Sequence, residues 1–246
     1  MSTTQLGIIK SYRSPSGRKR RKANLKRKIK ALLIDLDGTL VDSREAYMEA
    51  FKAAMKAIGK TTFNHEAVFE VPKRLEQGLP IEDLIGNKAL TEKFLEKYLS
   101  TYYEATLHKA KPFPNVSQTL EKLSEKLSLA LITMRFIPKE KLEKELKKLG
   151  FHKYFCATLT ALDVKTPKPS PEAILKCLKS LNVHVSECAV VGDSIVDIRS
   201  GKLAGAKTVA VLSGLFREEE LRKEKPDVII RNFNEILTVP LLRDVF

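Results

Sequence analysis

Short runs of consecutive apolar residues recur along the chain and predict the buried strands of a sheet. The first run is Ala31-Leu32-Leu33-Ile34, and later runs occupy residues 129–132, 155–159, 188–191, 209–212 and 228–230. Continuous apolar runs are typical of parallel strands that are covered on both faces. From residue 115 onward they alternate with segments of helical spacing. The pattern therefore predicts an α/β fold with a doubly wound, mainly parallel sheet.

Capping residues mark the ends of several predicted helices. Ser170, followed by Pro171 and Glu172, predicts a helix that runs to about residue 181, because Ser is a favoured N-cap and Pro is tolerated in the first turn. Gly150 and Gly205 follow the segments 139–149 and 197–204. A glycine at such a place commonly ends a helix in the left-handed conformation. We therefore expect helices between the later strands.

The segment between residues 43 and 111 shows no strand pattern, and its apolar residues recur at helical spacing. Pro72 and Pro80 are expected to break it into several short helices, because proline disrupts a helix interior. Pro112 and Pro114 precede the return of the strand pattern. We predict a helical insertion over residues 43–111, a sheet domain built from residues 29–42 and 112–246, and a separate N-terminal tail over residues 1–28.

The charge of the chain is concentrated in that tail. The formal net charge is +14, and residues 1–30 contain 11 of the 44 Lys and Arg residues and no acidic residue. A polar, like-charged segment of this kind is expected to be flexible. Residues 18–30 could contact nucleic acid or another polyanion. A targeting or nuclear-localisation segment, a contact with acidic lipid headgroups, and a tail without a role are alternative interpretations.

No run reaches the roughly 18 uninterrupted apolar residues that a membrane-spanning helix requires, and the N-terminus lacks the apolar core of a secretory signal. We therefore expect no membrane span and a cytoplasmic location. The three cysteines, Cys156, Cys177 and Cys188, contain no C-x-x-C pair. This spacing excludes the common metal-binding and redox motifs and favours reduced thiols.

Two acidic clusters follow predicted strands. Asp35 and Asp37 come directly after the run 31–34, and Asp193 and Asp197 follow the run 188–191. Ligands of open α/β sheets bind at the carboxyl ends of the strands. Carboxylates placed together repel one another unless a cation lies between them. The sequence therefore predicts a Mg²⁺ site at this edge of the sheet.

Four motifs in order along the chain resemble those of the haloacid dehalogenase (HAD) superfamily of phosphohydrolases, in the branch with a helical cap inserted after the first strand. The resemblance covers about residues 29–236 and implies a Rossmann-like core with a small cap that governs substrate choice. The motifs are Asp35-Leu36-Asp37-Gly38-Thr39, Thr133 at a strand end, Lys168 before Pro169, and Gly192-Asp193-Ser194 with Asp197.

The resemblance implies a role for each of these residues. Asp35 would attack phosphorus and form an aspartyl-phosphate, and Asp37 would act as general acid and then general base. Thr133 and Lys168 would stabilise the phosphoryl group. The implied Mg²⁺ ligands are Asp35, Asp37 through its backbone carbonyl, and Asp193. Asp197 would not bind the metal directly but would orient the metal ligands or Lys168.

One feature departs from the family pattern. The family commonly has Asn after the strand-end Thr or Ser, but Met134 and Arg135 follow Thr133 here. Arg135 is a candidate contact to phosphate or substrate, or a solvent-facing charge. Arg44, close after the first motif, is a second candidate substrate contact.

The expected substrate is a small phosphorylated metabolite, and the motif spacings favour phosphoglycolate. A sugar-phosphate phosphatase, a pyrophosphatase and a phosphomutase similar to β-phosphoglucomutase would keep the same core residues and stay open as alternatives. A different class of function is a nucleic-acid-binding protein that uses the basic tail, with the sheet domain as a scaffold. The complete set of catalytic residue types argues against that interpretation. The sequence does not indicate an oligomeric state.

Overall fold

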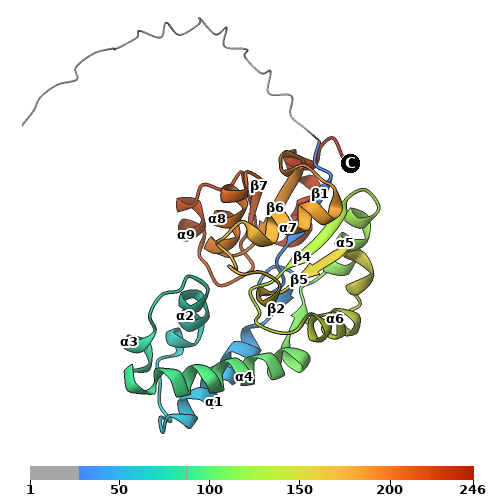
Figure 1. Ribbon diagram of the computed structural model, residues 1–246. Coiled ribbons are helices and arrows are strands. Elements are labelled where there is room, and N and C mark those ends of the chain that lie inside the picture. The colour runs from blue at the N-terminus through green and yellow to red at the C-terminus, as the bar shows by residue number, and fades with distance from the viewer. Residues whose placement is uncertain (1–27, 87) are drawn as a thin grey trace, which may run out of the picture.

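A computed structural model of the chain describes residues 28–86 and 88–246 (Figure 1). The predicted basic tail, apart from Lys28 itself, lies outside the described residues. Within the described part, no helix is both long enough and apolar enough to cross a membrane.

A six-stranded sheet forms the core, and each predicted apolar run supplies one strand. The order of the strands is β5-β4-β1-β6-β7-β8, and every pairing is parallel. Their bounds are β1 (Ala31–Ile34), β4 (Ser128–Ile132), β5 (Ala157–Leu159), β6 (Cys188–Gly192), β7 (Lys207–Val211) and β8 (Val228–Ile230). The predicted run 155–159 forms a shorter strand, since residues 155 and 156 connect the 3₁₀ turn η2 (His152–Tyr154) to β5. The α/β fold is confirmed.

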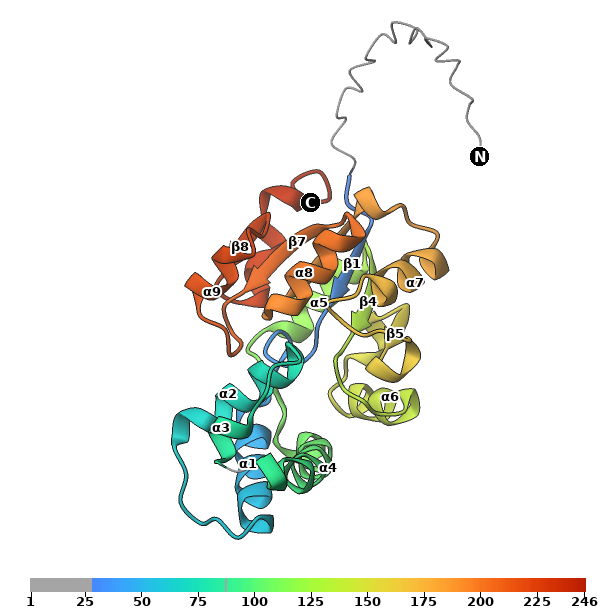
Figure 2. The ribbon, with the colours of Figure 1, turned by 60° about the vertical axis from the view of Figure 1, so that its left-hand side comes forward.

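Helices cover both faces of the sheet, as the continuous apolar strands predicted (Figures 1 and 2). Leu32 and Ile34 pack on the face of α5 (Val116–Ser124), α6 (Lys139–Lys148), η5 (Phe233–Thr238) and η6 (Pro240–Leu242). Leu33 packs on the opposite face, which α7 (Glu172–Leu181), α8 (Ile195–Ala204) and α9 (Glu218–Lys223) cover. Short 3₁₀ segments, η3 (Ala161–Asp163) and η4 (Val185–Glu187), lie in the connections.

Two predicted helix starts differ from the structure by one or two residues. Helix α7 begins at Glu172 with Pro171 as its N-cap, although the Ser170 hydroxyl still accepts a hydrogen bond from the Glu172 amide at 3.3 Å. Helix α8 begins at Ile195, so Asp197 lies within the first turn and not at the start. Gly150 and Gly205 follow their helices with φ of 76° and 85°, as predicted.

The insertion consists of helices, and its bounds are α1 (Arg44–Ala57), α2 (His65–Glu76), α3 (Glu82–Ile85), η1 (Lys88–Leu90) and α4 (Thr91–Lys109). The prediction that Pro72 breaks a helix is wrong, because Pro72 lies inside α2. Pro72 is buried together with Val68 and Val71, so packing against the rest of the insertion holds this helix despite the missing backbone donor. Pro80 does separate α2 from α3.

A two-stranded antiparallel pair joins the insertion to the core. It consists of β2 (Val41–Asp42) and β3 (Lys111–Pro112), which the sequence did not predict. Since this pair holds the entry and exit of the insertion side by side, α1 leads away from the sheet and α4 returns (Figure 2). We keep residues 43–111 as the proposed limits of the cap, with residues 1–28, 29–42 and 112–246 as the other proposed parts.

Candidate active site

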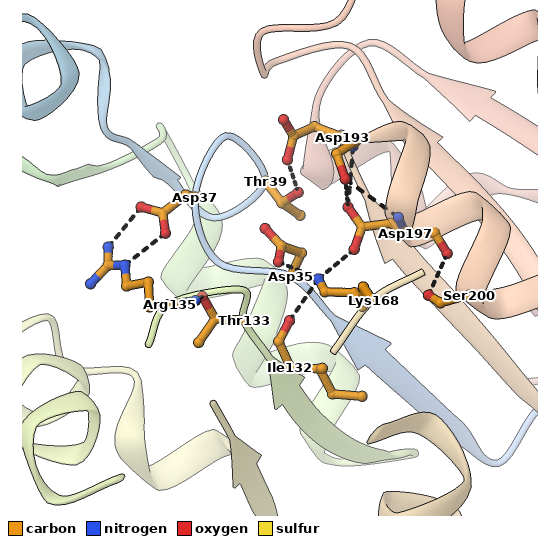
Figure 3. Close-up of polar contacts among 11 residues, drawn as sticks. Asp35, Asp37, Thr39, Ile132, Thr133, Arg135, Lys168, Asp193, Asp197 and Ser200 are labelled. Atoms are coloured by element: carbon orange, nitrogen blue, oxygen red, sulfur yellow. Dashed lines mark hydrogen bonds and ion pairs between the residues drawn. The ribbon is translucent and has the colours of Figure 1, made fainter. Parts of the chain in front are cut away.

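The acidic residues meet where three neighbouring strands end. Strand β1 lies between β4 and β6, so the residues that follow these strands are brought to one edge of the sheet. Asp35 follows β1, Thr133 follows β4, and Asp193 follows β6. Figure 3 shows these side chains together with Lys168 and Asp197. The structure thus gathers residues that are more than 150 positions apart in the chain.

Lys168 links two of the carboxylates. Its ammonium lies 2.7 Å from Asp35 Oδ1 and 2.5 Å from Asp197 Oδ1, and it also donates to the carbonyl of Ile132 at 3.0 Å (Figure 3). The side chain is buried, with 5% of the residue exposed. Burial alone would lower the pKa of Lys168, but Asp197 and Asp35 raise it above its ordinary value. Lys168 is therefore a permanent positive charge next to Asp35.

Both carboxylate oxygens of Asp197 already accept hydrogen bonds from the protein. It is the third residue of α8 and forms a capping box with Ser194, whose amide and hydroxyl donate to Asp197 Oδ2 at 3.1 and 2.8 Å. Its other oxygen accepts from Lys168. A side chain at Gly192 would come within 2.2 Å of this carboxylate, so only glycine fits there. Asp197 thus fixes the position of Lys168. The supporting role that the family resemblance implies for it stays a prediction.

Asp193 is held tightly and lacks a positive partner among the described residues. The hydroxyl of Thr39 donates to its Oδ1 at 2.8 Å, and Cβ atoms at Gly38 and Gly214 would come within 2.4 and 1.6 Å of Oδ2. Burial, followed by the charges of Asp35 and Asp197, raises the pKa of Asp193 well above its ordinary value. A cation next to this carboxylate would favour its ionised form.

The carboxylates of Asp35, Asp193 and Asp197 fit a divalent cation. Their oxygens lie within 4.8 Å of one another, and all three residues are buried. Carboxylate oxygens are the ligands that a small hard cation prefers. The sequence predicted Asp35, Asp37 and Asp193, whereas the side-chain cluster contains Asp197 in place of Asp37. Because Asp197 already binds Lys168 and Ser194, Asp35 and Asp193 are the carboxylates with capacity left for a metal.

Opposing effects act on the pKa of Asp35. Burial raises the pKa of Asp35 to about 7, Lys168 counteracts that rise, and the charges of Asp197 and Asp37 add to it. Only Oδ1 has a hydrogen-bond partner among the described residues, namely Lys168. The second oxygen is left for a metal or a reacting atom.

Asp37 turns its side chain toward Arg135 and away from the acidic cluster (Figure 3). Arg135 Nε and Nη2 each donate to one Asp37 oxygen at 2.7 Å, and Nη1 donates to Glu145 at 2.5 Å. Ser43 also donates to Asp37. Burial alone would raise the pKa of Asp37, but the Arg135 charge and these hydrogen bonds hold it below its ordinary value. Asp37 is an ionised, oriented carboxylate.

The two candidate arginines differ in placement. Arg135 is only 3% exposed, so the solvent-facing interpretation is wrong, and two carboxylates already occupy its guanidinium. Arg44 is largely exposed and pairs with Asp42, at the rim of a small space of about 10 Å³ that Asp193 also lines. Thr133 is buried next to Asp35, and its hydroxyl accepts from the Arg135 amide at 3.3 Å.

A cavity of about 110 Å³ lies between these residues and the insertion. Asp35, Asp37, Thr133 and Arg135 line it from the sheet side. Glu76 and Tyr98, which were not among the site residues predicted from the sequence, line it from α2 and α4. A signal for Glu76 was present, because it stands four residues after Pro72 and thus on the apolar face of its helix. An acidic residue on such a face indicates a functional role.

Comparison with known proteins agrees with this arrangement. Phosphoglycolate phosphatase of Aquifex aeolicus is 30% identical over 214 residues, which cover 85% of this chain and 95% of that protein. Pyrophosphatase PpaX of Oceanobacillus iheyensis is 29% identical over 216 residues, or 86% of this chain and 96% of that protein. These proteins match along almost their whole length.

A solved structure shows the same fold. The haloacid dehalogenase-like family hydrolase of Streptococcus pneumoniae superposes with a TM-score of 0.72 at 24% identity, over 85% of this chain and 97% of that one. The family described as haloacid dehalogenase-like hydrolase matches residues 32–211, which is more than half of the chain. The chain therefore belongs to the haloacid dehalogenase-like hydrolase family and is a phosphatase-type enzyme.

Proposed function

We propose that this protein is a Mg²⁺-dependent phosphatase that hydrolyses a small phosphorylated metabolite through a covalent aspartyl-phosphate on Asp35. The observation that carries the proposal is the placement of Asp35. One of its carboxylate oxygens is bound by Lys168, and the other has no partner among residues 28–86 and 88–246. The residue lines the cavity together with Thr133 and Asp37. A carboxylate fixed in this way can attack an electrophile that enters the cavity.

The reaction has two steps. In the first, Asp35 forms a bond to phosphorus, and the bond from phosphorus to the leaving oxygen breaks while Asp37 gives that oxygen a proton. In the second, water attacks the phosphorus of the acyl phosphate, Asp37 takes the proton, and Asp35 is released together with phosphate. Lys168, which binds Asp35, and Thr133, which lines the cavity, would stabilise the charge of the phosphoryl oxygens.

A bound Mg²⁺ would offset the negative charge of the phosphoryl group and of the acidic cluster. Asp35 and Asp193 would hold it through their carboxylates, and Asp37 through its backbone carbonyl. Asp197 would act by keeping Lys168 in place, since both of its oxygens are occupied. The burial of Asp193 without a cationic partner among the described residues supports this assignment.

Asp37 needs a change of partner during the cycle. Its contact with Arg135 favours the ionised form, which suits the second step, where Asp37 accepts a proton from water. The first step requires protonated Asp37, so the ion pair with Arg135 must loosen when substrate binds. Arg135 thereby gains a free hydrogen-bond donor at the moment when the phosphoryl group arrives.

Phosphoglycolate and pyrophosphate are the reference substrates. Phosphoglycolate is the candidate that the motif spacings favour, and the name of the Aquifex aeolicus relative supports it. Pyrophosphate is supported by the name of the Oceanobacillus iheyensis relative. The nucleic-acid interpretation depends on residues 18–30, which fall almost entirely outside the described part of the chain, and it stays a prediction.

The test is phosphate release from a panel of small phosphoesters and pyrophosphate, with Mg²⁺ and with excess chelator. We expect turnover only with the metal, because the metal would offset the negative charge of the acidic cluster and of the phosphoryl group. Turnover that persists unchanged in chelator would contradict the metal-dependent mechanism. The absence of turnover of every panel member would contradict the phosphatase proposal as a whole.

Mg²⁺ is also expected to stabilise the fold, and more so at higher pH. The pKa of Asp35 is raised to about 7, so the folded chain keeps a proton that the unfolded chain releases near pH 4. This contribution to stability is present at acidic pH and is lost as the pH rises through 7. Metal binding replaces the proton, so the gain should be larger at pH 8 than at pH 5.5.

At a metal concentration 100 times the dissociation constant, binding adds about 2.7 kcal/mol, or roughly 5–10 °C in melting temperature. Thermal unfolding with increasing Mg²⁺ at both pH values measures this shift. Asp193→Asn should remove most of it. An equal shift in Asp193→Asn would place the metal elsewhere.

A further inference from the structure

The guanidinium of Arg135 binds two buried carboxylates through different nitrogens. Nε and Nη2 donate to the two oxygens of Asp37 at 2.7 Å each, whereas Nη1 donates to Glu145 Oε2 at 2.5 Å. Figure 3 shows the first of these two contacts. Because the carboxylates share no donor, Asp37 can leave the arginine while Glu145 stays bound to it.

Contacts other than Asp37 hold Arg135 in place. Its carbonyl accepts from the Ala161 amide at 3.0 Å, its amide donates to the Thr133 hydroxyl at 3.3 Å, and Nη1 also donates to Thr106 at 3.4 Å. The residue is buried. The side chain therefore does not need Asp37 to keep its position, but a buried positive charge does need a carboxylate partner.

Glu145 supplies one more negative charge than Arg135 needs while the substrate is absent. Asp37 alone neutralises the guanidinium, and Glu145 lies with Leu142 and Leu146 on the buried face of α6. Glu145 Oε1 is buried and has no hydrogen-bond partner within residues 28–86 and 88–246. Burial raises the pKa of Glu145, and the charge of Arg135 counteracts that rise. A half-satisfied buried carboxylate destabilises a fold, so its presence indicates a role beyond packing.

The additional charge is needed when the first carboxylate leaves. In the proposed reaction the contact between Asp37 and Arg135 loosens as substrate binds, because Asp37 then gives a proton to the leaving oxygen. If Asp37 were the only partner, this step would leave a buried guanidinium without a counter-charge, which is costly. With Glu145 present, Arg135 and Glu145 remain as a neutral buried pair.

We propose that Glu145 is a positioning residue of the phosphatase reaction, which holds Arg135 as its counter-charge while Asp37 turns from the arginine to the substrate. The inference rests on the proposed function and adds a residue to it. Glu145 is not among the residues that line the 110 Å³ cavity, so it acts through Arg135 and not on the substrate.

Leaving groups of different basicity test this role. An alkyl phosphoester releases an alcohol oxygen, which needs the proton of Asp37, whereas acetyl phosphate releases acetate, a weak base that leaves without one. The measurement is kcat/KM with Mg²⁺ for acetyl phosphate and for the best alkyl phosphoester of the panel. Glu145→Gln keeps the size of the side chain and removes its charge. We expect kcat/KM to fall at least about 10-fold for the alkyl ester and less than about 3-fold for acetyl phosphate.

Two further variants separate charge from packing. Glu145→Asp keeps the negative charge, so it should retain more activity toward the alkyl ester than Glu145→Gln does. A purely structural hydrogen bond would give the opposite order, because glutamine has the length of the native side chain. In the Arg135→Met background, Glu145→Gln should change the ratio of the two kcat/KM values less than about 2-fold, because the charge that Glu145 balances is gone.

Glu143→Gln is the matched control. Glu143 lies in the same helix and pairs with Lys139 at 3.8 Å, and both side chains are partly exposed. The same chemical change should leave kcat/KM for both substrates within about 2-fold of the wild type, because exposed ion pairs contribute little.

The two substrates are compared in one protein preparation, so a loss of folded protein does not change their ratio. A ratio that Glu145→Gln leaves at the wild-type value overturns the inference and leaves the aspartyl-phosphate mechanism intact. So does a wild type that turns over only one of the two substrates. Without alkyl turnover no leaving oxygen needs Asp37, and without turnover of acetyl phosphate the proton does not limit the reaction. If neither a phosphoester nor pyrophosphate is turned over, the proposed function and this inference fail together.

Discussion

Asp35→Asn is expected to abolish turnover, with kcat reduced by at least about 10⁴-fold. The amide of asparagine is not a nucleophile toward phosphorus, and no other described carboxylate has the same combination of a Lys168 contact and a free oxygen facing the cavity. The variant should nevertheless fold, since it removes one of several buried negative charges. Phosphate release and circular dichroism on the same preparation measure both expectations.

Asp42→Asn is the matched control for Asp35→Asn. Asp42 is the last residue of β2, seven positions after Asp35, and its carboxylate pairs with Arg44 near the surface. The same chemical change should alter kcat less than about 3-fold there, because exposed ion pairs contribute little. If Asp35→Asn kept more than a hundredth of the activity, Asp35 would not be the nucleophile. Phosphate bound covalently to wild-type protein and absent from Asp35→Asn would support the assignment further.

Lys168→Met is expected to impair both stability and activity. Removing the ammonium leaves Asp35 and Asp197 buried without their positive partner, and the loss of one member of a buried ion pair costs about 3–5 kcal/mol. For a chain of this size that corresponds to roughly 6–20 °C in melting temperature. Activity should fall by about 10²-fold or more, because the charge that stabilises the phosphoryl oxygens is gone. Thermal unfolding and phosphate release measure the two effects.

Lys207→Met provides the comparison for Lys168→Met. Lys207 pairs with Asp227 at the same 2.7 Å distance, but its side chain is half exposed. Its removal should cost less than about 1 kcal/mol. The two variants should therefore differ clearly in melting temperature. If Lys168→Met lowered the melting temperature no more than Lys207→Met does, Lys168 would not be an essential part of the buried network. Lys168→Arg should retain part of the stability, since the positive charge is kept.

The contacts of Arg135 explain the departure of this chain from the common family motif. Where the family commonly has Asn, this chain has Met134 and then Arg135. The guanidinium of Arg135 pairs with Asp37 and with Glu145, a residue of α6. Glu145 is a buried acidic residue of a helix that is otherwise charged and exposed on its outer face. The arginine and its two carboxylates form one unit that orients the Asp37 side chain before substrate binds.

The sequence by itself determined the strands and the order of the chemical motifs. Buried parallel strands require uninterrupted apolar residues, and residues such as Asp35 and Asp193 stand out because they end such runs. The helical insertion followed from its periodicity. These features are local, because each depends on residues that are neighbours in the chain or one turn apart.

The tertiary structure decided which side chains meet. The alternation of strands and helices does not reveal the strand order β4-β1-β6. This order brings Thr133, Asp35 and Asp193 to one edge of the sheet. The pairing of Arg135 with Asp37 spans 98 positions, and Glu76 reaches the cavity from α2, in the helical insertion. Such contacts depend on how whole helices and strands pack against one another. Only that packing decides which carboxylate oxygens accept a hydrogen bond and which are left without one.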